Sequence, residues 1–327
     1  MKADSSTRRR WWRRSALTAI TCLAVALATT APAQASYPGA NGRIAFADNA
    51  GQAAPTIREI YTVRPDGTGK RQLTHDRLFD ACPAYSPDGR WIAYCRGAVT
   101  QPDRHMEIWI MRADGRHQRP LTKLGGFATF PDFSPNGRRL VFTLVAEDGS
   151  SDLWTVSRNG HHARPLTRTP GVSEDNAAWS PSGSSIVFLR TGSDGIGQVW
   201  LHAVRSGEER QLTFDPFNKS QAPDWSPDGK QIAYEREIDG KGDIWLMNAD
   251  GRSQHPLITN IIDDFGPNWS PDGHQLAFVR ALPNGNQIFV SNADGTDQHI
   301  LSPSTGGQAV PGWQPRRTPH QKTHLEQ

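Results

Sequence analysis

The sequence has 327 residues, of which 21% are charged, and a formal net charge of +3. Residues 1–35 hold six Lys and Arg against one Asp, so the rest of the chain keeps 30 basic and 32 acidic residues and a formal net charge of −2. The basic excess therefore lies in the N-terminal segment, which argues against nucleic-acid binding by the rest of the chain.

The N-terminal segment has the order of a secretory signal peptide. Arginines at residues 8–14 precede an apolar run at residues 16–28, and Ala-Gln-Ala at residues 33–35 offers a small-residue cleavage site. The apolar run is shorter than the roughly 20 residues of a membrane-spanning helix, and we expect no membrane span in the mature chain. Residues 7–12 also suit a twin-arginine signal, so both export routes stay open. We expect a periplasmic, cell-surface or secreted protein with a signal peptide at 1–35.

A turn motif recurs through the rest of the chain. Ser-Pro-Asp-Gly at residues 86–89 returns with small changes at 134–137, 180–183, 226–229 and 270–273. Each copy is followed by three apolar segments typical of short strands. Their first or central residues form three series of six: Ile44, Ile92, Leu140, Ile186, Ile232, Leu276; Ile60, Ile108, Leu153, Val199, Ile244, Ile288; and Leu73, Leu121, Leu166, Leu212, Leu257, Leu301.

This period of about 46 residues predicts one four-stranded antiparallel blade per repeat, and therefore an all-β, six-bladed β-propeller over residues 36–315. Proline at the second position of the motif suits a type I turn, and glycine at the fourth suits a left-handed conformation. The first unit lacks an upstream inner strand. We expect the segment around Trp313 to pair beside Ile44–Phe46 and to close the ring. Residues 316–327 are predicted to be a flexible polar tail.

Aromatic residues support the same count. Three series of six recur at matching positions of the predicted strands, and we expect them to fill the core between blades; stacking on carbohydrate is the alternative. The positions are Tyr85, Phe133, Trp179, Trp225, Trp269, Trp313; Phe46, Tyr94, Phe142, Phe188, Tyr234, Phe278; and Tyr61, Trp109, Trp154, Trp200, Trp245, Phe289.

The repeat resembles a known family. The pattern from Pro223 to Thr259, with Trp-Ser-Pro-Asp-Gly and then Asp-Ile-Trp-Leu-Met-Asn-Ala-Asp-Gly, is similar to the WD40-like repeats of the TolB propeller. The resemblance implies a periplasmic propeller that binds a peptidoglycan-associated lipoprotein and other envelope proteins. The sequence departs from TolB because the α/β domain that precedes the TolB propeller has no room between Ala35 and Ile44. We expect a monomeric, non-catalytic scaffold that binds an envelope or secreted protein.

Motifs of catalytic chemistry are largely absent. The chain has no nucleophile-elbow, zinc-helix or phosphate-loop motif. No cofactor is expected, although calcium is possible because several loops carry Asp-Gly. The alternative function is a hydrolase or polysaccharide lyase that uses a calcium ion in the channel of a six-bladed propeller.

The predicted binding site lies on the face opposite the Ser-Pro turns, because the connections there vary in length and composition. These connections hold aromatic and acidic residues that could receive a basic or mixed peptide or a cation; folding inward to plug the channel and capping turns are the alternatives. The candidate residues are Phe79, Asp80, Phe130, Glu174, Asp175, Phe217, Asp263, Asp264 and Phe265. Cys82 and Cys95 flank the turn at 86–89 at nearly equal distances, which predicts a disulfide between the first two strands of one blade.

Overall fold

A computed structural model describes residues 37–49, 57–76, 78–99, 105–216 and 219–316. The predicted signal peptide, the predicted tail beyond Arg316 and the candidate Phe217 lie outside these residues. The described residues all belong to one compact unit. No helix in the described part of the chain is long and apolar enough to span a membrane.

The described residues form an all-β unit whose strands are short and consecutive. In chain order the strands are β1 (Ala40–Asp48), β2 (Glu59–Val63), β3 (Arg71–Gln72), β4 (Phe79–Tyr85), β5 (Trp91–Ala98), β6 (His105–Arg112), β7 (Arg119–Pro120), β8 (Phe127–Phe133), β9 (Arg139–Val145), β10 (Ser151–Ser157), β11 (Arg164–Pro165), β12 (Ser173–Trp179), β13 (Ser185–Thr191), β14 (Gly197–Ala203), β15 (Glu209–Gln211), β16 (Lys219–Trp225), β17 (Gln231–Ile238), β18 (Lys241–Asn248), β19 (His255–Ile258), β20 (Asp264–Trp269), β21 (Gln275–Leu282), β22 (Gly285–Asn292), β23 (His299–Ile300) and β24 (Gln308–Arg316).

These strands pair in antiparallel groups of four. Four of the groups are separate sheets, β24-β1-β2-β3, β12–β15, β16–β19 and β20–β23. The other two, β4–β7 and β8–β11, are joined into one eight-stranded sheet by a single parallel pair between Met106 and Phe127. We number the groups 1 to 6, with β24-β1-β2-β3 as group 1 and β20–β23 as group 6. The predicted propeller of four-stranded antiparallel sheets is confirmed, whereas the expected separation of all the sheets fails at this one pair.

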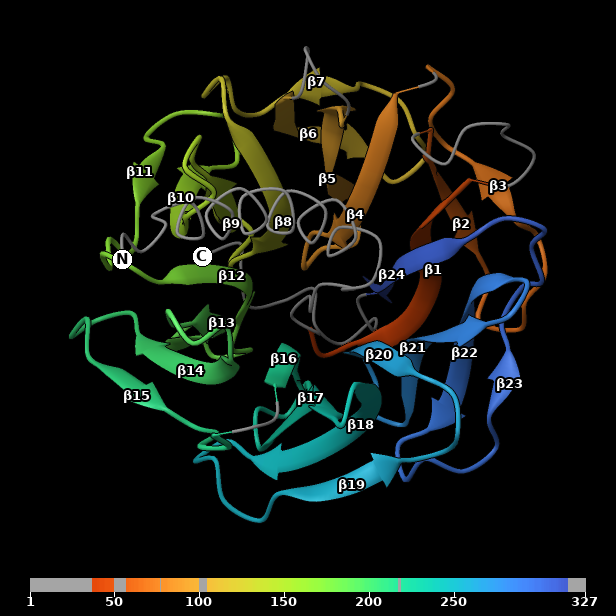
Figure 1. Ribbon diagram of the computed structural model, residues 1–327. Helices are drawn as coiled ribbons and strands as arrows, with labels where there is room; N and C mark the ends of the chain where they lie inside the picture. Colours follow the sequence, from red (N-terminus) through yellow and green to blue (C-terminus); the bar gives the residue numbers. More distant parts are fainter. Residues whose placement is uncertain (1–36, 50–56, 77, 100–104, 217–218, 317–327) are drawn as a thin grey trace, which may run out of the picture. The chain divides into compact units, whose positions relative to one another are not determined.

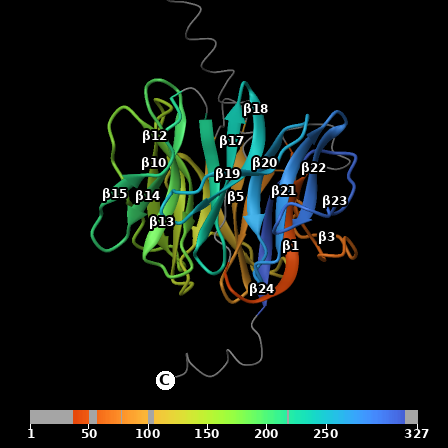
Figure 2. The same cartoon turned by 90° about the horizontal axis from the view of Figure 1, so that it is seen from below.

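The first strand of each group is its inner strand. Figure 1 shows the groups arranged around a common centre with these strands innermost, and Figure 2 shows the strands of each group running between the two faces of the unit. Each inner strand contacts the next, in the order β4, β8, β12, β16, β20, β24 and back to β4. In group 1 the inner strand is C-terminal, because β24 pairs with β1 and places Trp313 opposite Ile44, as the sequence predicted.

The Ser-Pro turns join the inner strand to the second strand of groups 2 to 6. In the first of them, the Ser86 hydroxyl donates to Asp88 at 2.6 Å and accepts from the Trp91 amide at 3.0 Å. Gly89 has a φ of 66°, the left-handed value that the motif predicts at its fourth position. The face that carries these turns is called the turn face, and the opposite face, formed largely by connections between groups, is called the connection face.

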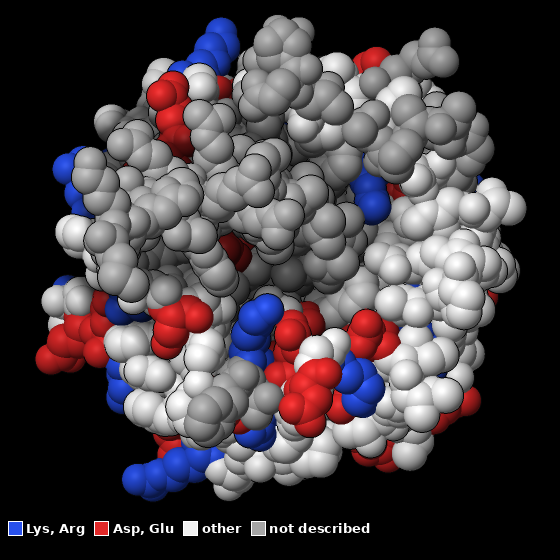
Figure 3. All heavy atoms as spheres, in the orientation of Figure 1, with Lys and Arg blue, Asp and Glu red and all other residues white. Residues whose placement is uncertain are grey.

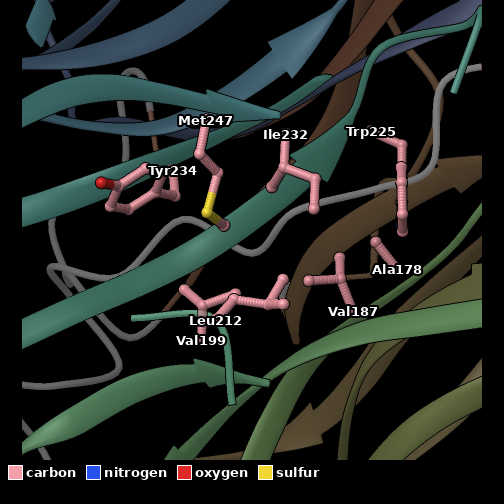
Figure 4. Packing of buried hydrophobic residues seen from close by; sticks show 8 residues of the cluster. All are labelled: Ala178, Val187, Val199, Leu212, Trp225, Ile232, Tyr234 and Met247. Carbon is pink, nitrogen blue, oxygen red and sulfur yellow. The ribbon is translucent and has the colours of Figure 1, made fainter. Parts of the chain in front are cut away.

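The hydrophobic core lies between neighbouring groups. Trp225 of β16 packs with Val187 of group 4 and Ile232 of its own group, and Figure 4 shows the side chains of this cluster converging from both groups. The inner-strand and second-strand aromatic series are buried, as expected. The third-strand series differs from the expectation, because Trp109, Trp200 and most of its other members are half-buried.

Candidate functional site

All six inner strands contain a β-bulge at the same position, on the side of the strand that leads to the connection face. Five inner strands show one register shift against the second strand, and β24 shows two against β1, one of them at this same position. One residue at the shift has a φ between 48° and 60°. Only one of the six is glycine, so five side chains adopt a conformation that is uncommon outside glycine. The residues are Cys82, Phe130, Asn176, Ala222, Gly266 and Val310.

Three of the predicted acidic residues form ion pairs inside the protein. Each stands directly opposite an arginine of the second strand: Asp80 opposite Arg96, Glu174 opposite Arg190, and Asp264 opposite Arg280. The Nε and Nη2 atoms of Arg96 donate to the two carboxylate oxygens of Asp80, both at 2.7 Å. Arg280 binds Asp264 in the same bidentate way, at 2.7 and 2.8 Å. All three acidic side chains have 0% exposure.

The arginines of these pairs also stack on aromatic rings. The guanidinium carbon of Arg96 lies 4.8 Å from the ring centroid of Trp109, and that of Arg190 lies 4.5 Å from Trp200. This contact accounts for the half-buried Trp109 and Trp200, each of which holds a cation over its ring. Burial raises the pKa of Asp80 to about 6 although Arg96 opposes this shift. The prediction that Asp80, Glu174 and Asp264 form an open acidic surface is therefore wrong, because an arginine side chain already neutralises each of them.

The predicted aromatic residues do not form an open surface either. Phe130 and Phe265 lie in inner strands with exposures of 8% and 5%, so the inward-folded alternative applies to them. Phe79 is half-buried and contacts the guanidinium of Arg58, 5.8 Å from its ring centroid. Among the described residues of the connections, the exposed aromatic is Phe214, at 71%, which was not one of the predicted site residues.

Two of the predicted acids differ from the other three, because neither forms an ion pair within the described part of the chain. Asp175 lies beside the bulge of β12, where burial raises its pKa to about 7 and Asn176 donates to it at 2.6 Å. Asp263 precedes β20 and accepts from the Gly242 amide at 3.2 Å.

The sequence missed a buried carboxyl group next to this region. Glu235 of β17 is 5% exposed, and burial raises its pKa to about 8. Its Oε1 accepts from the Gln221 amide group at 2.8 Å, and its Oε2 is buried with no hydrogen-bond partner among the described residues. Comparison of the repeats could have revealed Glu235. Groups 4 and 6 carry the apolar residues Leu189 and Val279 at the matching position, so an acidic residue there departs from the pattern.

Charged side chains gather on the connection face above Glu235. Figure 3 shows acidic and basic groups side by side over β16, β17 and β20. Lys219 and Glu237 lie 3.5 Å apart, and both of them, with Asp263, act electrostatically on Glu235. We call Asp175, Gln221, Glu235 and Asp263 the polar arc; its members belong to groups 4, 5 and 6.

One group of carboxylates meets the geometric condition for a metal site. Oxygen atoms of Glu59, Asp76 and Asp80 all lie within 4.8 Å of one another. The guanidinium of Arg96 already binds two of them, with Nη2 at 2.5 Å from Asp76 and 2.7 Å from Asp80, and Thr74 donates to Glu59 at 2.6 Å. These carboxylates are therefore already engaged by Arg96 and Thr74, and we do not propose a calcium site there.

The two cysteines are free and buried, so the predicted disulfide is wrong. The bulge places Ala81, and not Cys82, opposite Cys95 in the strand register, although the Cys82 side chain still interacts with the Cys95 thiol. The Cys95 thiol donates instead to the Ala81 carbonyl at 3.2 Å, and burial raises its pKa.

A family model described as the TolB beta propeller domain matches residues 37–221 and 216–320. The chain belongs to this family. A TolB homolog of Chlorobium luteolum is 39% identical over 57 residues, which are 16% of this chain and 13% of that protein. The match therefore spans a small part of the relative's length.

Solved structures of the TolB propeller share the fold. TolB from Acinetobacter baumannii is 22% identical with a TM-score of 0.72, over 84% of this chain and 67% of that one. A putative TolB from Agrobacterium tumefaciens is 19% identical with a TM-score of 0.63, over 84% of this chain and 99% of that one. An oligogalacturonate lyase from Vibrio parahaemolyticus is 10% identical with a TM-score of 0.53, over 72% of each chain. At these identities the likeness extends to the fold alone.

Proposed function

We propose that this TolB-family propeller is an exported, non-catalytic scaffold of the cell envelope that binds a basic segment of a partner protein at the polar arc. The observation that carries the proposal is the contrast among the acids on the connection side of the inner strands. Asp80, Glu174 and Asp264 are neutralised by arginines, whereas the half-buried Asp175 and the buried Glu235 form no ion pair among the described residues.

The scaffold in this proposal is a closed ring of six blades, one for each strand group. Support comes from the pairing of β24 with β1 and from the cyclic contacts of the inner strands. On the turn face, the Gly39 amide donates to the Pro271 carbonyl at 3.0 Å, and Asn41 donates to Asp272 at 2.9 Å. These bonds tie the first group to the last on the turn face.

Export is supported by the signal-like pattern of residues 1–35, and a protein partner by the fold family. A basic partner suits the polar arc because Glu235 Oε2 and the carboxylate of Asp175 accept hydrogen bonds and gain stability from an adjacent positive charge. The exposed Lys219 and the half-buried Glu237 at the rim suit a partner of mixed charge that makes its main contact at the arc. For the alternative of a calcium-dependent hydrolase or lyase, the described part of the chain offers one carboxylate cluster, which Arg96 already binds.

The test compares two variants of the full chain, purified after export. In the first variant Asp175→Asn, Glu235→Gln and Asp263→Asn remove the acids of the arc; in the control Asp114→Asn and Asp250→Asn remove two exposed acids from hairpin turns of the turn face. Envelope proteins captured by each variant are identified, and the affinity of a recovered partner is measured at two salt concentrations. We expect the arc variant to lose about tenfold or more in affinity, the control to bind like the original protein, and binding to weaken with salt.

Equal loss in both variants, or a partner that binds the arc variant unchanged, would contradict the proposal. Both variants are first compared by thermal unfolding, so that a loss of binding is not mistaken for a loss of fold.

A further inference from the structure

Arg236 of group 5 is the one arginine of its series whose opposite residue is not an acid. Its partner across the strands is Ser220, at the position where groups 2, 4 and 6 carry Asp80, Glu174 and Asp264. The Arg236 guanidinium still stacks on a third-strand aromatic, with its carbon 4.4 Å from the Trp245 ring centroid. Group 5 therefore keeps the arginine and its aromatic support but replaces the carboxylate by a hydroxyl.

Group 2 shows what the complete arrangement holds. There Arg96 binds the inner-strand acid Asp80 and also Asp76, which follows the outer strand and lies 2.5 Å from its Nη2. In group 5 the residue matching Asp76 is Asp215, also three residues after the strand leucine, and it lies 2.5 Å from Nη2 of Arg236. Group 2 thus places two carboxylates around one guanidinium, and group 5 places one.

The donor that the missing acid would engage is left without a partner. Nε of Arg96 donates to Asp80 and Nε of Arg280 donates to Asp264, each at 2.7 Å. Nε of Arg236 is buried and has no hydrogen-bond partner among the described residues. A buried donor without a partner is unfavourable, so a group that accepts from this Nε would bind with a gain in stability.

A pocket of about 350 Å³ opens at this position. It is lined by Thr213, Phe214, Asp215, Pro216, Ser220, Arg236 and Gln254. The connection that forms one wall is anchored, because Gln198 donates to the Asp215 carbonyl at 2.6 Å and accepts from the Asp215 amide at 3.3 Å. The ring of Phe214, 71% exposed, offers an apolar surface beside the guanidinium.

We propose that this pocket binds a carboxylate group of a ligand, which accepts from Arg236 Nε in the place that Asp80 occupies in group 2. A carboxylate is the fitting anion because the same backbone seats a carboxylate in three other groups of this chain. With the ligand bound, Arg236 would lie between two carboxylates, those of Asp215 and the ligand. Group 2 has the same charges, because Arg96 lies between Asp76 and Asp80. An apolar group attached to the carboxylate packs on Phe214 and Pro216. This site is separate from the polar arc, and the proposal does not depend on a basic partner.

The test follows the Arg236 Nε–H resonance of the isotope-labelled full chain by NMR during titration with acetate and with N-acetylphenylalanine. We expect a saturable shift with a dissociation constant of about 1 to 10 mM for acetate, and about fivefold tighter binding of N-acetylphenylalanine because its ring packs on Phe214. The Arg96 Nε–H resonance, whose donor is already bound by Asp80, serves as the internal control and should not move.

Two substitutions separate a built site from general anion attraction. Ser220→Asp supplies the missing carboxylate and should lower the affinity for both probes by about tenfold or more, whereas Ser220→Ala should leave it within about twofold. If Ser220→Asp does not fold, Arg236→Gln provides the same test when binding is followed through the backbone amide resonance of Phe214, which lines the pocket, and it should abolish the saturable shift of that resonance. Unchanged binding in Ser220→Asp or Arg236→Gln, or no saturable shift in the original protein, would overturn the proposal. Binding of acetate and N-acetylphenylalanine with equal affinity would overturn the role of Phe214.

Discussion

The two halves of each inner strand, on either side of the bulge, follow different rules. On the turn side the same chemistry returns. The inner strand of each group carries an aromatic residue, such as Trp225, that packs between groups, and in groups 2 to 6 a Ser-Pro turn closes on its own hydrogen bonds. On the connection side the backbone is equally regular, but the residues opposite the second strand differ from group to group, as Asp80, Ser220 and Gln308 illustrate.

This difference indicates where the repeat is free to vary. A turn-side aromatic fills a gap bounded by two neighbouring groups, so its size is fixed by both. A connection-side residue contacts an arginine, a connection or solvent, so its size and charge are less constrained. Each group therefore carries a different residue there. Sites for partners and ligands are therefore expected on the connection side, and loss of stability is expected to be greatest on the turn side.

The largest effect should come from removing the turn-side half of β24. Ending the chain after Ala309 deletes Trp313 and most of the pairing with β1. A large aromatic lost from a core costs about 3 to 5 kcal/mol by itself, and the exposed edge of β1 adds to this. We expect a loss of cooperative thermal unfolding, whereas ending the chain after Arg317 should leave the unfolding temperature nearly unchanged. Similar curves for the two truncations would show that β24 is not needed for the fold.

The next effect concerns an ion pair on the connection side. Asp80→Ala leaves the guanidinium of Arg96, whose side chain is 7% exposed, with Asp76 as its remaining acidic partner. Removing one member of a buried ion pair costs about 3 kcal/mol at the lower end of the usual range. The matched change Ser220→Ala in group 5 should cost less than about 0.5 kcal/mol. Urea unfolding at pH 7 measures both, and equal costs would mean that the acid–arginine pairs do not stabilise the inner strands.

Much of the fold could be predicted from the sequence because the repeat encodes it locally. The Ser-Pro turns, the strand leucines and the position of Trp313 determine strand order and pairing without knowledge of distant contacts. The site could not be predicted in the same way. Whether Asp80 is an open ligand or an internal ion pair depends on Arg96, sixteen residues away and directly opposite only because of the strand register.

The bulge in the inner strands was also beyond sequence reasoning. Five of its six left-handed positions carry residues other than glycine, so composition gives no signal for it. The same shift sets which residues of the inner strands stand opposite Cys95 and Glu235, so predictions made by counting from the turn miss by one position there.

The smallest effect should be a pH dependence that arises from Glu235 of the polar arc. Burial raises the pKa of this carboxyl group from its usual 4.5 to about 8. Between these two values the folded protein holds a proton that the unfolded chain has released, so stability from this group is complete below pH 4.5 and is lost as the pH rises to about 8. Glu235→Gln keeps the uncharged shape and removes the titration.

The unfolding temperature of Glu235→Gln should therefore rise relative to that of the original protein between pH 5 and pH 8, with roughly 2 to 4 °C for each kcal/mol of difference. Asp175→Asn sharpens the test, because burial raises the pKa of Asp175 to about 7 and its relative gain should level off one pH unit earlier. Parallel pH profiles for Glu235→Gln and the original protein would mean that the Glu235 carboxyl group is already neutralised by a positive charge, and the contrast between the polar arc and the arginine-paired acids would then fail.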